Sequence, residues 1–409
     1  MMTSRRVIFI NRFYWPDSPA TAQLLTDLAE ALAARSVSVI VVTTGTSKMP
    51  AAETHRGVAI VRLSQRQLYP ASLWRRMRDC EQFRRGVRAW LEGNLEKEDI
   101  LVSLTDPPLI GVTVTKMARR KGARMIHWVQ DIFPEIAANV FGIPLLNLLR
   151  ASRDQAWRGA SLCVTPGEAM RDFIVARGVP QARTIAIPNW APVGLAPVSA
   201  ETVAAWKARH QLADKFVVMY SGNLGRAHDF NWCVPLAETF RNDPRIVFAF
   251  VGMGPRLATL EAAVAEAGLA NVHFLPPAPR ADLAALLSAG DVHVVSIRAG
   301  CETLVFPSKL AGISAVGRPT LVIGPTGSEP TRLVTTAGWG RGFSPTDITG
   351  MNALLRDWMD HRSMLHALSE RALAASPQTQ FNLALSAWEQ ILLANDDSSG
   401  AVKLVPAAS

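Results

Sequence analysis

The chain has 409 residues, of which 49% are hydrophobic and 19% charged, and it carries a net charge of +9. This composition excludes a disordered chain, and the length exceeds what a single hydrophobic core usually supports. The four cysteines show neither metal-ligand spacing nor a paired pattern, and no apolar run reaches the roughly 18 residues that span a bilayer. We therefore expect two globular domains in a cytoplasmic protein, at most peripheral on the inner face of the cytoplasmic membrane.

Apolar, β-type runs alternate with helical or loop segments through the first half of the chain. The predicted strands are residues 7–10, 37–42, 58–63, 100–104, 125–129 and 161–164. A helix is predicted over 21–35, where Leu24, Leu28 and Leu32 recur at helical spacing. This alternation is typical of a parallel, doubly wound sheet, which binds its ligands at the carboxyl ends of the strands. The polar and aromatic loop 11–20 follows the first strand at that edge.

Most of the excess positive charge lies between residues 62 and 90. This stretch contains eight arginines and only two acidic residues, Asp79 and Glu81, so its net charge is +6. Apolar residues recur between them at helical spacing, which predicts a basic amphipathic helix or helix pair. Such a surface can lie on anionic lipid. The contacts would be Arg75, Arg76, Arg84, Arg85 and Arg88. The alternatives are a solvated basic face whose apolar side packs on the sheet, and a nucleic-acid patch, for which no recognisable module is present.

A second alternating series follows a proline-containing stretch. Its predicted strands are residues 216–221, 246–251, 272–274, 292–296 and 320–323. Two similar α/β halves are implied. The predicted organisation is an N-terminal Rossmann-like domain over 1–190, a linker over 191–214, a C-terminal Rossmann-like domain over 215–375, a helix within 376–395 that packs back toward the N-terminal domain, and a polar tail over 396–409.

The stretch from Pro307 to Gly317 predicts a helix that holds an anion. Proline suits the first turn, and the glycine ends the helix after about ten residues. The first turn leaves backbone N–H groups unpaired at the positive end of the helix dipole, where the chain adds the hydroxyl of Ser308 and the cation of Lys309. The alternative is an ordinary proline-capped helix with a chance lysine.

A glycine-bearing turn, residues 222–226, follows the strand predicted over 216–221. Gly222 and Gly225 permit close backbone approach, and the guanidinium of Arg226 can bind a phosphate through two parallel hydrogen bonds. The alternative is a tight strand-to-helix turn without a ligand.

A second turn places Gly252 and Gly254 after the strand predicted over 246–251. The spacing invites comparison with a dinucleotide-binding fingerprint, but Leu257 holds the third glycine position and no acidic residue ends the following strand. A NAD or FAD site is therefore disfavoured.

Four polar segments would share the carboxyl edge of the second sheet. They are residues 222–226, 252–256, 298–302 and 308–309. A diphosphate held there by Arg226, Lys309 and helix N–H groups needs no metal, because fixed donors meet the charge that appears on the leaving diphosphate. Glu302 lies just before the anion site, where its carboxylate can bind sugar hydroxyls.

Taken together, these motifs resemble family 4 glycosyltransferases of the GT-B fold, in particular the bacterial enzymes that build exopolysaccharide, colanic acid and O-antigen repeat units. The resemblance covers about residues 6 to 393. In the second half it rests on residues 189–190, 220–225, 252–255, 307–309 and 317–319. In the first half it rests on residues 12–17, 24–29, 105–108 and 128–135.

The resemblance implies an α/β protein of the GT-B type, with two Rossmann-like, doubly wound domains and a cleft between them. It implies retaining, metal-independent transfer of a sugar from a UDP- or GDP-linked donor on the second domain. The acceptor would be a polyprenyl-diphosphate-linked or other saccharide held by the first domain, and neither a cofactor nor nucleic acid is expected.

Individual roles also follow from the resemblance. Arg226 and Lys309 would hold the donor diphosphate, and Glu302 would contact the donor sugar. Asp131 is the candidate for the polar group near the reacting carbon, with a helix-capping role before Pro134 as the alternative. The further substrate-binding candidates are Asp17, Thr105, Asp106, Gly222, Asn223, Gly225, Gly252, Gly254, Pro307, Ser308 and Glu329.

The chain departs from the family pattern at one pair of positions. Many members carry two glutamates eight residues apart, where this chain has Leu304 and Gly312. The glutamate that often holds the nucleotide ribose is therefore absent, and Glu329 is the candidate to replace it. Two other functions stay open: a nucleotide-sugar epimerase of the same fold, which forms product without an acceptor, and a non-catalytic membrane-associated partner that kept the fold.

Overall fold

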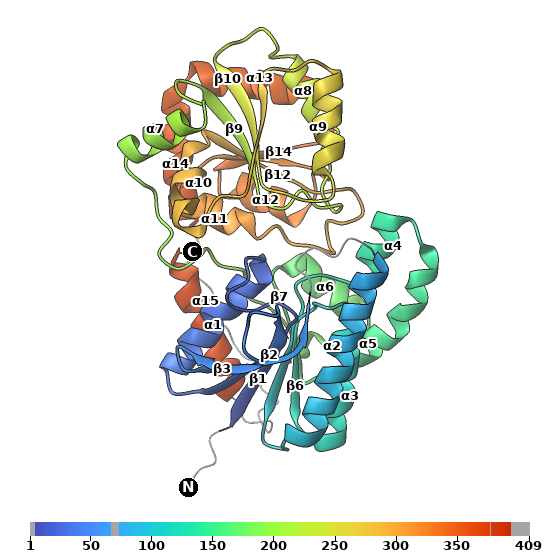
Figure 1. The fold of residues 1–409 in the computed structure, drawn as a ribbon. Coiled ribbons are helices and arrows are strands. Elements are labelled where there is room, and N and C mark those ends of the chain that lie inside the picture. The colour runs from blue at the N-terminus through green and yellow to red at the C-terminus, as the bar shows by residue number, and fades with distance from the viewer. Residues whose placement is uncertain (1–4, 67–72, 377, 394–409) are drawn as a thin grey trace. The chain divides into compact units, whose positions relative to one another are not determined.

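The computed structural model describes residues 5–66, 73–376 and 378–393 (Figure 1). The chain divides into two compact units. The first unit comprises Met1–Asn189 together with Asn382–Ser409, and the second unit comprises Trp190–Phe381. The polar tail predicted over 396–409 lies outside the described residues.

The first unit is built on a mostly parallel sheet. Its strands are β1 (Arg6–Ile10), β2 (Ser38–Gly45), β3 (Ala52–His55), β4 (Val58–Gln65), β5 (Ile100–Ser103), β6 (Arg124–Trp128), β7 (Leu162–Thr165) and β8 (Thr184–Ala186). They follow the order β3-β4-β2-β1-β5-β6-β7-β8, and β3 is antiparallel to β4. The first strand therefore lies inside the sheet, as a doubly wound fold requires.

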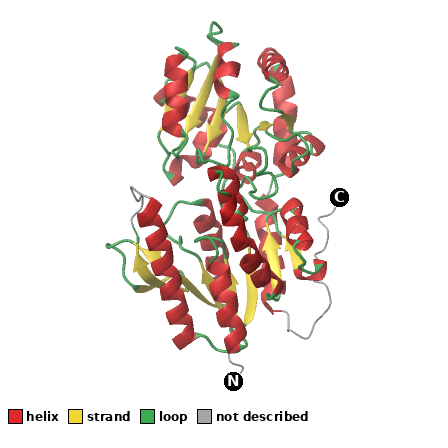
Figure 2. Ribbon diagram, turned by 90° about the vertical axis from the view of Figure 1, so that its right-hand side faces the viewer, coloured by secondary structure: helices red, strands yellow, loops and turns green. Residues whose placement is uncertain are grey.

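Helices flank this sheet, and Figure 2 shows strands lying between helices in each unit. The helical elements of the first unit are α1 (Ala20–Ala34), α2 (Leu73–Asn94), α3 (Ile110–Lys121), α4 (Glu135–Phe141), η1 (Pro144–Leu149), α5 (Arg150–Arg158), α6 (Glu168–Ala176) and η2 (Gln181–Arg183). Most of α15 (Gln378–Leu393) also belongs to this unit. Its Trp388 is fully buried, with its ring centroid 4.9 Å from that of Trp128.

The basic stretch forms one helix, α2, with two different parts. Phe83, Val87 and Leu91 are fully buried in a hydrophobic cluster with strand residues, so this part packs its apolar side on the sheet. Nearer the start of the helix, Trp74 is 80% exposed and Met77 53% exposed. The apolar spacing therefore predicted the helix, but only the apolar residues of its later turns are buried in the core.

The second unit is built on a parallel sheet in the order β11-β10-β9-β12-β13-β14. The strands are β9 (Phe216–Ser221), β10 (Ile246–Val251), β11 (Val272–Leu275), β12 (Val292–Ser296), β13 (Thr320–Ile323) and β14 (Gly340–Phe343). The helical elements are α7 (Ala200–Arg209), α8 (Cys233–Glu238), α9 (Leu257–Glu266), η3 (Arg280–Asp282), α10 (Leu283–Ala289), α11 (Lys309–Ala315), α12 (Glu329–Thr336), α13 (Ile348–Asp360) and α14 (Arg362–Ala374). Both sheets confirm the predicted α/β class.

Some predicted boundaries need correction. The stretch 191–214, expected as a linker, contains α7, and its Trp206 is buried with Val217 and Met219 in the core of the second unit. Strands β3, β8 and β14 were not predicted, because they are short and lack an apolar run. Within the described part of the chain, no helix is both long and apolar enough to cross a membrane.

Candidate functional site

Two glycine turns meet at the carboxyl edge of the second sheet. The N–H of Gly222 donates to the carbonyl of Val251 (2.9 Å), and that of Leu224 donates to the carbonyl of Met253 (2.9 Å). Gly252 has φ 144°, and a Cβ there would lie 2.1 Å from the carbonyl oxygen of Gly222. Only glycine fits this position, because the two backbones are in direct contact.

Asn223 and Gly254 lie at the same junction. A Cβ on Gly254 would come within 2.7 Å of the Asn223 Oδ1, and the carbonyl of Asn223 accepts a hydrogen bond from the Tyr220 hydroxyl (2.9 Å). A Cβ on Gly225 would lie 3.1 Å from the Asn223 Nδ2. Residues 222–225 and 252–254 are therefore held together as a rigid backbone surface, which we call the shelf. Asn223 is exposed on the shelf.

Lys309, the first residue of α11, points its side chain at this shelf. Its Nζ lies 3.4 Å from the ring centroid of Tyr220 and 3.7 Å from the Cβ position at Gly222. The Nζ is buried and has no hydrogen-bond partner among the described residues. Burial lowers the pKa of Lys309 to about 7. An anionic ligand on the shelf would supply the missing partner.

The helix that carries Lys309 is shorter than predicted. It covers Lys309–Ala315 rather than about ten residues, so Pro307 precedes it. The N–H groups of Leu310 and Ala311 already donate to the carbonyls of Pro307 and Ser308 at 3.2 Å each. The first turn therefore offers fewer free N–H groups than expected, and the lysine side chain is the main candidate of this segment for contact with an anion.

His228 joins the site and was not predicted. Its Nδ1 lies 2.6 Å from the carbonyl oxygen of Ser296, and burial, with the nearby charge of Lys309, lowers the pKa of His228 to about 4. The ring is therefore neutral at pH 7, and because Nδ1 faces a carbonyl it carries the proton. Its Nε2 is left as an acceptor for a ligand hydroxyl. The available sequence signal was the position of His228 three residues after Gly225, in the loop that follows β9.

Glu302 and Arg226 lie on loops that touch each other. The N–H of Arg298 donates to the carbonyl of Ala227 (2.9 Å), which joins the loop after β12 to the loop after β9. The Oε2 of Glu302 is buried without a hydrogen-bond partner among the described residues, while Arg226 is exposed. A buried carboxylate oxygen with spare lone pairs can accept hydrogen bonds from sugar hydroxyls.

The surroundings of Gly312 show why a glutamate, common in the family at this position, does not suit this chain. A Cβ at this position would lie 3.3 Å from Leu287 Cδ1 and 3.5 Å from Leu195 Cδ2, inside an apolar cluster. A glutamate pointing that way would bury its charge among leucines. Glu329 begins α12, directly after the loop that follows β13, so it lies at the same sheet edge as the shelf.

The first unit gathers its own polar residues at the carboxyl edge of its sheet. Arg12 follows β1, and its Nε lies 2.7 Å from the Oδ1 of Asp106, which follows β5. The N–H of Arg12 also donates to the carbonyl of Asp106 (2.8 Å). Burial, together with the charge of Asp106, raises the pKa of Asp131 to about 6. Asp106 is therefore close enough to Asp131 to act on its charge, and Arg12, which was not a predicted site residue, pairs with Asp106.

The alternative role of Asp131 as a helix cap is not observed. Helix α4 begins at Glu135, and its N-cap position is Pro134. Glu135 is buried, and Arg153 donates to both of its carboxylate oxygens at 2.8 Å. Glu135 is thus part of a structural ion pair, whereas Asp131 does not cap the helix.

Asp17 and Thr105 differ in how firmly they are held. Asp17 accepts a hydrogen bond from the N–H of Tyr14 (3.2 Å) and forms an ion pair with Arg66. Thr105 is half-buried next to Asp106.

Within the described residues, no three histidine, cysteine, aspartate or glutamate side chains gather as metal ligands.

Two Rossmann-like units with polar groups at the carboxyl edge of each sheet define the class of GT-B glycosyltransferases. Residues 21–190 match the family described as Glycosyl transferase 4-like domain, and residues 203–374 match the family described as Glycosyl transferases group 1. The chain belongs to the family 4 glycosyltransferases, a retaining enzyme family.

One relative agrees in sequence with this assignment, and two solved structures share the fold. A protein of Escherichia coli (strain K12), WcaI, named as a colanic acid biosynthesis glycosyl transferase, is 26% identical over 289 residues, which are 68% of this chain and 71% of that protein. The structure of HepE from Anabaena in complex with UDP-glucose has a TM-score of 0.70 at 15% identity, covering 94% of this chain and 99% of HepE. Sucrose-phosphate synthase from Thermosynechococcus elongatus has a TM-score of 0.76 at 17% identity, with 96% and 100% covered.

Proposed function

We propose that this glycosyltransferase moves a sugar from a nucleoside-diphosphate sugar to a lipid-linked saccharide in the synthesis of a cell-surface polysaccharide. The observation that carries the proposal is the buried Lys309 Nζ beside Gly222, which has no hydrogen-bond partner among the described residues. A departing nucleoside diphosphate gains negative charge in the transition state, and a fixed cation in a water-poor site stabilises that charge strongly. Arg226 is the second cation for the diphosphate, and Glu302 binds the donor sugar.

The similarity to HepE, which was solved with UDP-glucose, supports a uridine nucleotide as the first donor to test. Asp131 is the polar group on the acceptor side, and the charge of Asp106, which pairs with Arg12, acts on it. The carboxylate is ionised above about pH 6 and is then able to interact with positive charge at the reacting carbon.

The experiment is thermal-shift binding with UDP, GDP, ADP, CMP and dTDP. A nucleotide at about 100 times its dissociation constant stabilises the folded state by roughly 2.7 kcal/mol, which raises the melting temperature by about 5 °C. The test variant is Lys309→Met, which keeps the apolar stem and removes the ammonium group. The matched control is Lys215→Met, since Lys215 precedes β9 at the opposite sheet edge and donates to the carbonyl of Pro244.

We expect one nucleotide to stabilise the wild type and Lys215→Met, but not Lys309→Met. Equal stabilisation of both variants would remove Lys309 from the donor site. Incubating the nucleotide sugar without any acceptor tests the epimerase alternative, because an epimerase then forms an isomeric nucleotide sugar and a transferase does not. No response to any nucleotide would favour the non-catalytic partner.

We also propose that the exposed side of α2 contacts an anionic membrane. Trp74, Met77, Arg85 and Arg88 share one side of the helix at intervals of three, eight and three residues, and all four are exposed. Aromatic and basic side chains in this arrangement suit a membrane surface. Arg84 and Arg85 both pair with Glu81, which offsets part of their charge.

The membrane proposal predicts that Arg85→Glu with Arg88→Glu releases the protein from anionic vesicles in a sedimentation assay. The control is Arg119→Glu with Arg120→Glu, an equal charge change at the end of α3. If both double variants sediment alike, net charge rather than this side of α2 governs the contact.

A further inference from the structure

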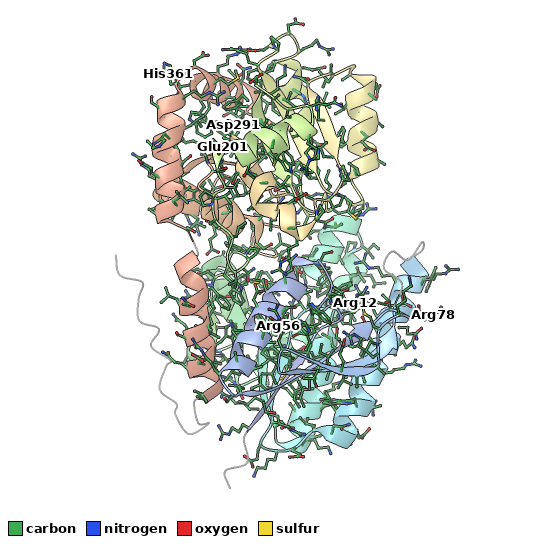
Figure 3. The ribbon with its side chains drawn as sticks, turned by 60° about the vertical axis from the view of Figure 1, so that its left-hand side comes forward. Arg12, Arg56, Arg78, Glu201, Asp291 and His361 are labelled. Atoms are coloured by element: carbon green, nitrogen blue, oxygen red, sulfur yellow. The ribbon has the colours of Figure 1, made fainter. Side chains whose placement is uncertain are left out.

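A hollow of about 450 Å³ lies in the first unit where the ends of β2 and β4 meet the start of α2. We call it the arginine pocket, because Arg66, Arg75 and Arg78 line it together with Asp79 and Gln82. Figure 3 shows Arg78 on this part of the unit. The volume is in the range of sites that hold small molecules.

Arg66 is the buried group of the arginine pocket. It directly follows β4, its N–H donates to the carbonyl of Gly45 (2.8 Å), and its side chain is only 2% exposed. Its guanidinium lies 4.7 Å from the ring centroid of Phe13 and forms an ion pair with Asp17 through Nη2. The Nε and Nη1 atoms are buried and have no hydrogen-bond partner among the described residues. A buried donor without an acceptor destabilises the folded chain, so these two atoms indicate a missing acceptor.

The start of α2 adds exposed charge to this buried donor. Arg75, Arg78, Asp79 and Gln82 are spaced at i, i+3, i+4 and i+7, which places them on one face of the helix. This face differs from the one that buries Phe83 in the core. Three guanidinium groups line the pocket with the carboxylate of Asp79, and Asp17 pairs with Arg66 from outside the lining, so one positive charge remains in excess. This excess favours a ligand with negative oxygens, and the planar guanidinium matches phosphate geometry.

The pocket is connected to the acceptor-side residues by charge. Asp79 and Asp106 both act on the pKa of Arg12, and Arg12 donates from Nη1 to the Sγ of Cys80 at 3.4 Å. Asp106 in turn raises the pKa of Asp131. The guanidinium groups of Arg12 and Arg66 both lie over the ring of Phe13, 4.6 and 4.7 Å from its centroid, so the pocket adjoins the Arg12–Asp106 pair at the carboxyl edge of the first sheet. At the same end of α2, Trp74 offers an exposed apolar surface for a lipid chain.

We propose that the arginine pocket binds the diphosphate that joins the lipid to the sugar in the acceptor. The inference rests on the proposed function, because it names the part of the acceptor that the first unit recognises. Arg66 supplies buried hydrogen-bond donors, and Arg78 supplies an exposed guanidinium that can form two parallel hydrogen bonds. The apolar chain of the lipid contacts Trp74.

The experiment is calorimetric titration with farnesyl diphosphate, inorganic diphosphate and farnesol. All proteins carry Lys309→Met, so that the donor site does not bind the diphosphates. The pocket variant is Arg78→Gln, because Arg78 is exposed and its replacement spares the fold. The matched control is Arg119→Gln, an exposed arginine at the end of α3 that does not line the pocket.

We expect farnesyl diphosphate to bind more tightly than inorganic diphosphate, and farnesol not to bind. Arg78→Gln should weaken the binding of both diphosphates about tenfold or more, which is the loss of one charge-assisted hydrogen bond, while Arg119→Gln leaves their binding unchanged. Equal affinity in the two variants overturns the proposal. Arg78-dependent binding to phosphatidylglycerol vesicles without binding of farnesyl diphosphate also overturns it, and assigns the pocket to a phospholipid headgroup.

Failure of this inference is separable from failure of the proposed function. If a nucleotide stabilises the chain through Lys309 and Arg78→Gln behaves like the control, only the arginine pocket is wrongly assigned. If no nucleotide binds but Arg78 controls diphosphate affinity, the pocket stands and the transferase proposal falls.

Discussion

At the scale of single residues, burial moves two site residues toward their neutral forms. The pKa of Lys309 is lowered to about 7 and that of Asp131 is raised to about 6. A buried charge without a partner destabilises the folded chain, and groups held in this state are concentrated at functional sites. The folded chain should therefore be more stable with an uncharged side chain of similar shape at either position than with ionised Lys309 or Asp131.

Asp131→Asn tests this expectation. The pKa of Asp131 in the folded chain, about 6, lies above its ordinary value of 3.8, so between these values the folded chain binds more protons at this group and stability falls as pH rises. Asparagine does not ionise. The variant should gain about 1–3 kcal/mol above pH 6, should gain nothing near pH 4, and should lose most of its transfer activity. Urea unfolding at both pH values, with a transfer assay, measures these effects.

The control is Asp172→Asn, at an exposed residue of the same unit. It should change neither stability nor activity appreciably. An Asp131→Asn protein that is less stable at pH 7 than the wild type would show that this carboxylate has a structural role instead.

At the residue scale, the sequence names site candidates where short segments carry the signal. Lys309 and Asp131 stand in recognisable stretches and were predicted as site candidates. Arg12 and Arg66 were not predicted as site residues, because their partners are 94 and 49 residues away along the chain. An ion pair over such a separation depends on how the strands are ordered, and no local pattern reports that.

At the scale of elements, apolar runs predicted the interior strands and missed the weakly apolar ones. The bounds of β9, β10, β12 and β13 match the predicted residues. By contrast, β14 is Gly-Arg-Gly-Phe and pairs only with β13, so its strand geometry comes from the neighbouring strand rather than from its own side chains. The length of α11 was overestimated because Pro307 lies in the preceding turn.

Gly312 on α11 provides a prediction at this scale. Gly312→Glu, which introduces the residue common in the family, should destabilise the second unit by several kcal/mol, because its charge would enter the cluster of Leu195 and Leu287. It should therefore reduce nucleotide binding rather than improve it. Urea unfolding and the nucleotide thermal shift are the measurements.

Gly312→Ala is the matched control. Its Cβ would be 3.3 Å from Leu287 Cδ1, a tight contact, while alanine favours helix over glycine by about 1 kcal/mol. The two effects oppose each other, so stability should change by less than about 1 kcal/mol. A stable Gly312→Glu protein with stronger nucleotide binding would mean that the side chain turns toward the ligand.

At the scale of the whole molecule, the chain leaves the first unit after Asn189 and returns to it at Asn382. The second unit is thus inserted into the first, and each unit has its own hydrophobic clusters. Proteins with two such units need not unfold in one step. A ligand of the second unit should raise the stability of that unit selectively.

Trp388→Ala tests this independence. Trp388 lies on α15 and is fully buried beside Trp128 in the first unit, so its truncation should lower the stability of that unit by about 3–5 kcal/mol. Trp358→Ala, at a residue 2% exposed in the core of the second unit, is the matched change there. Scanning calorimetry with and without the stabilising nucleotide identifies the transition of the second unit. Trp388→Ala should lower the nucleotide-insensitive transition and Trp358→Ala the other, whereas a single transition lowered equally by both variants would show that the two units unfold together.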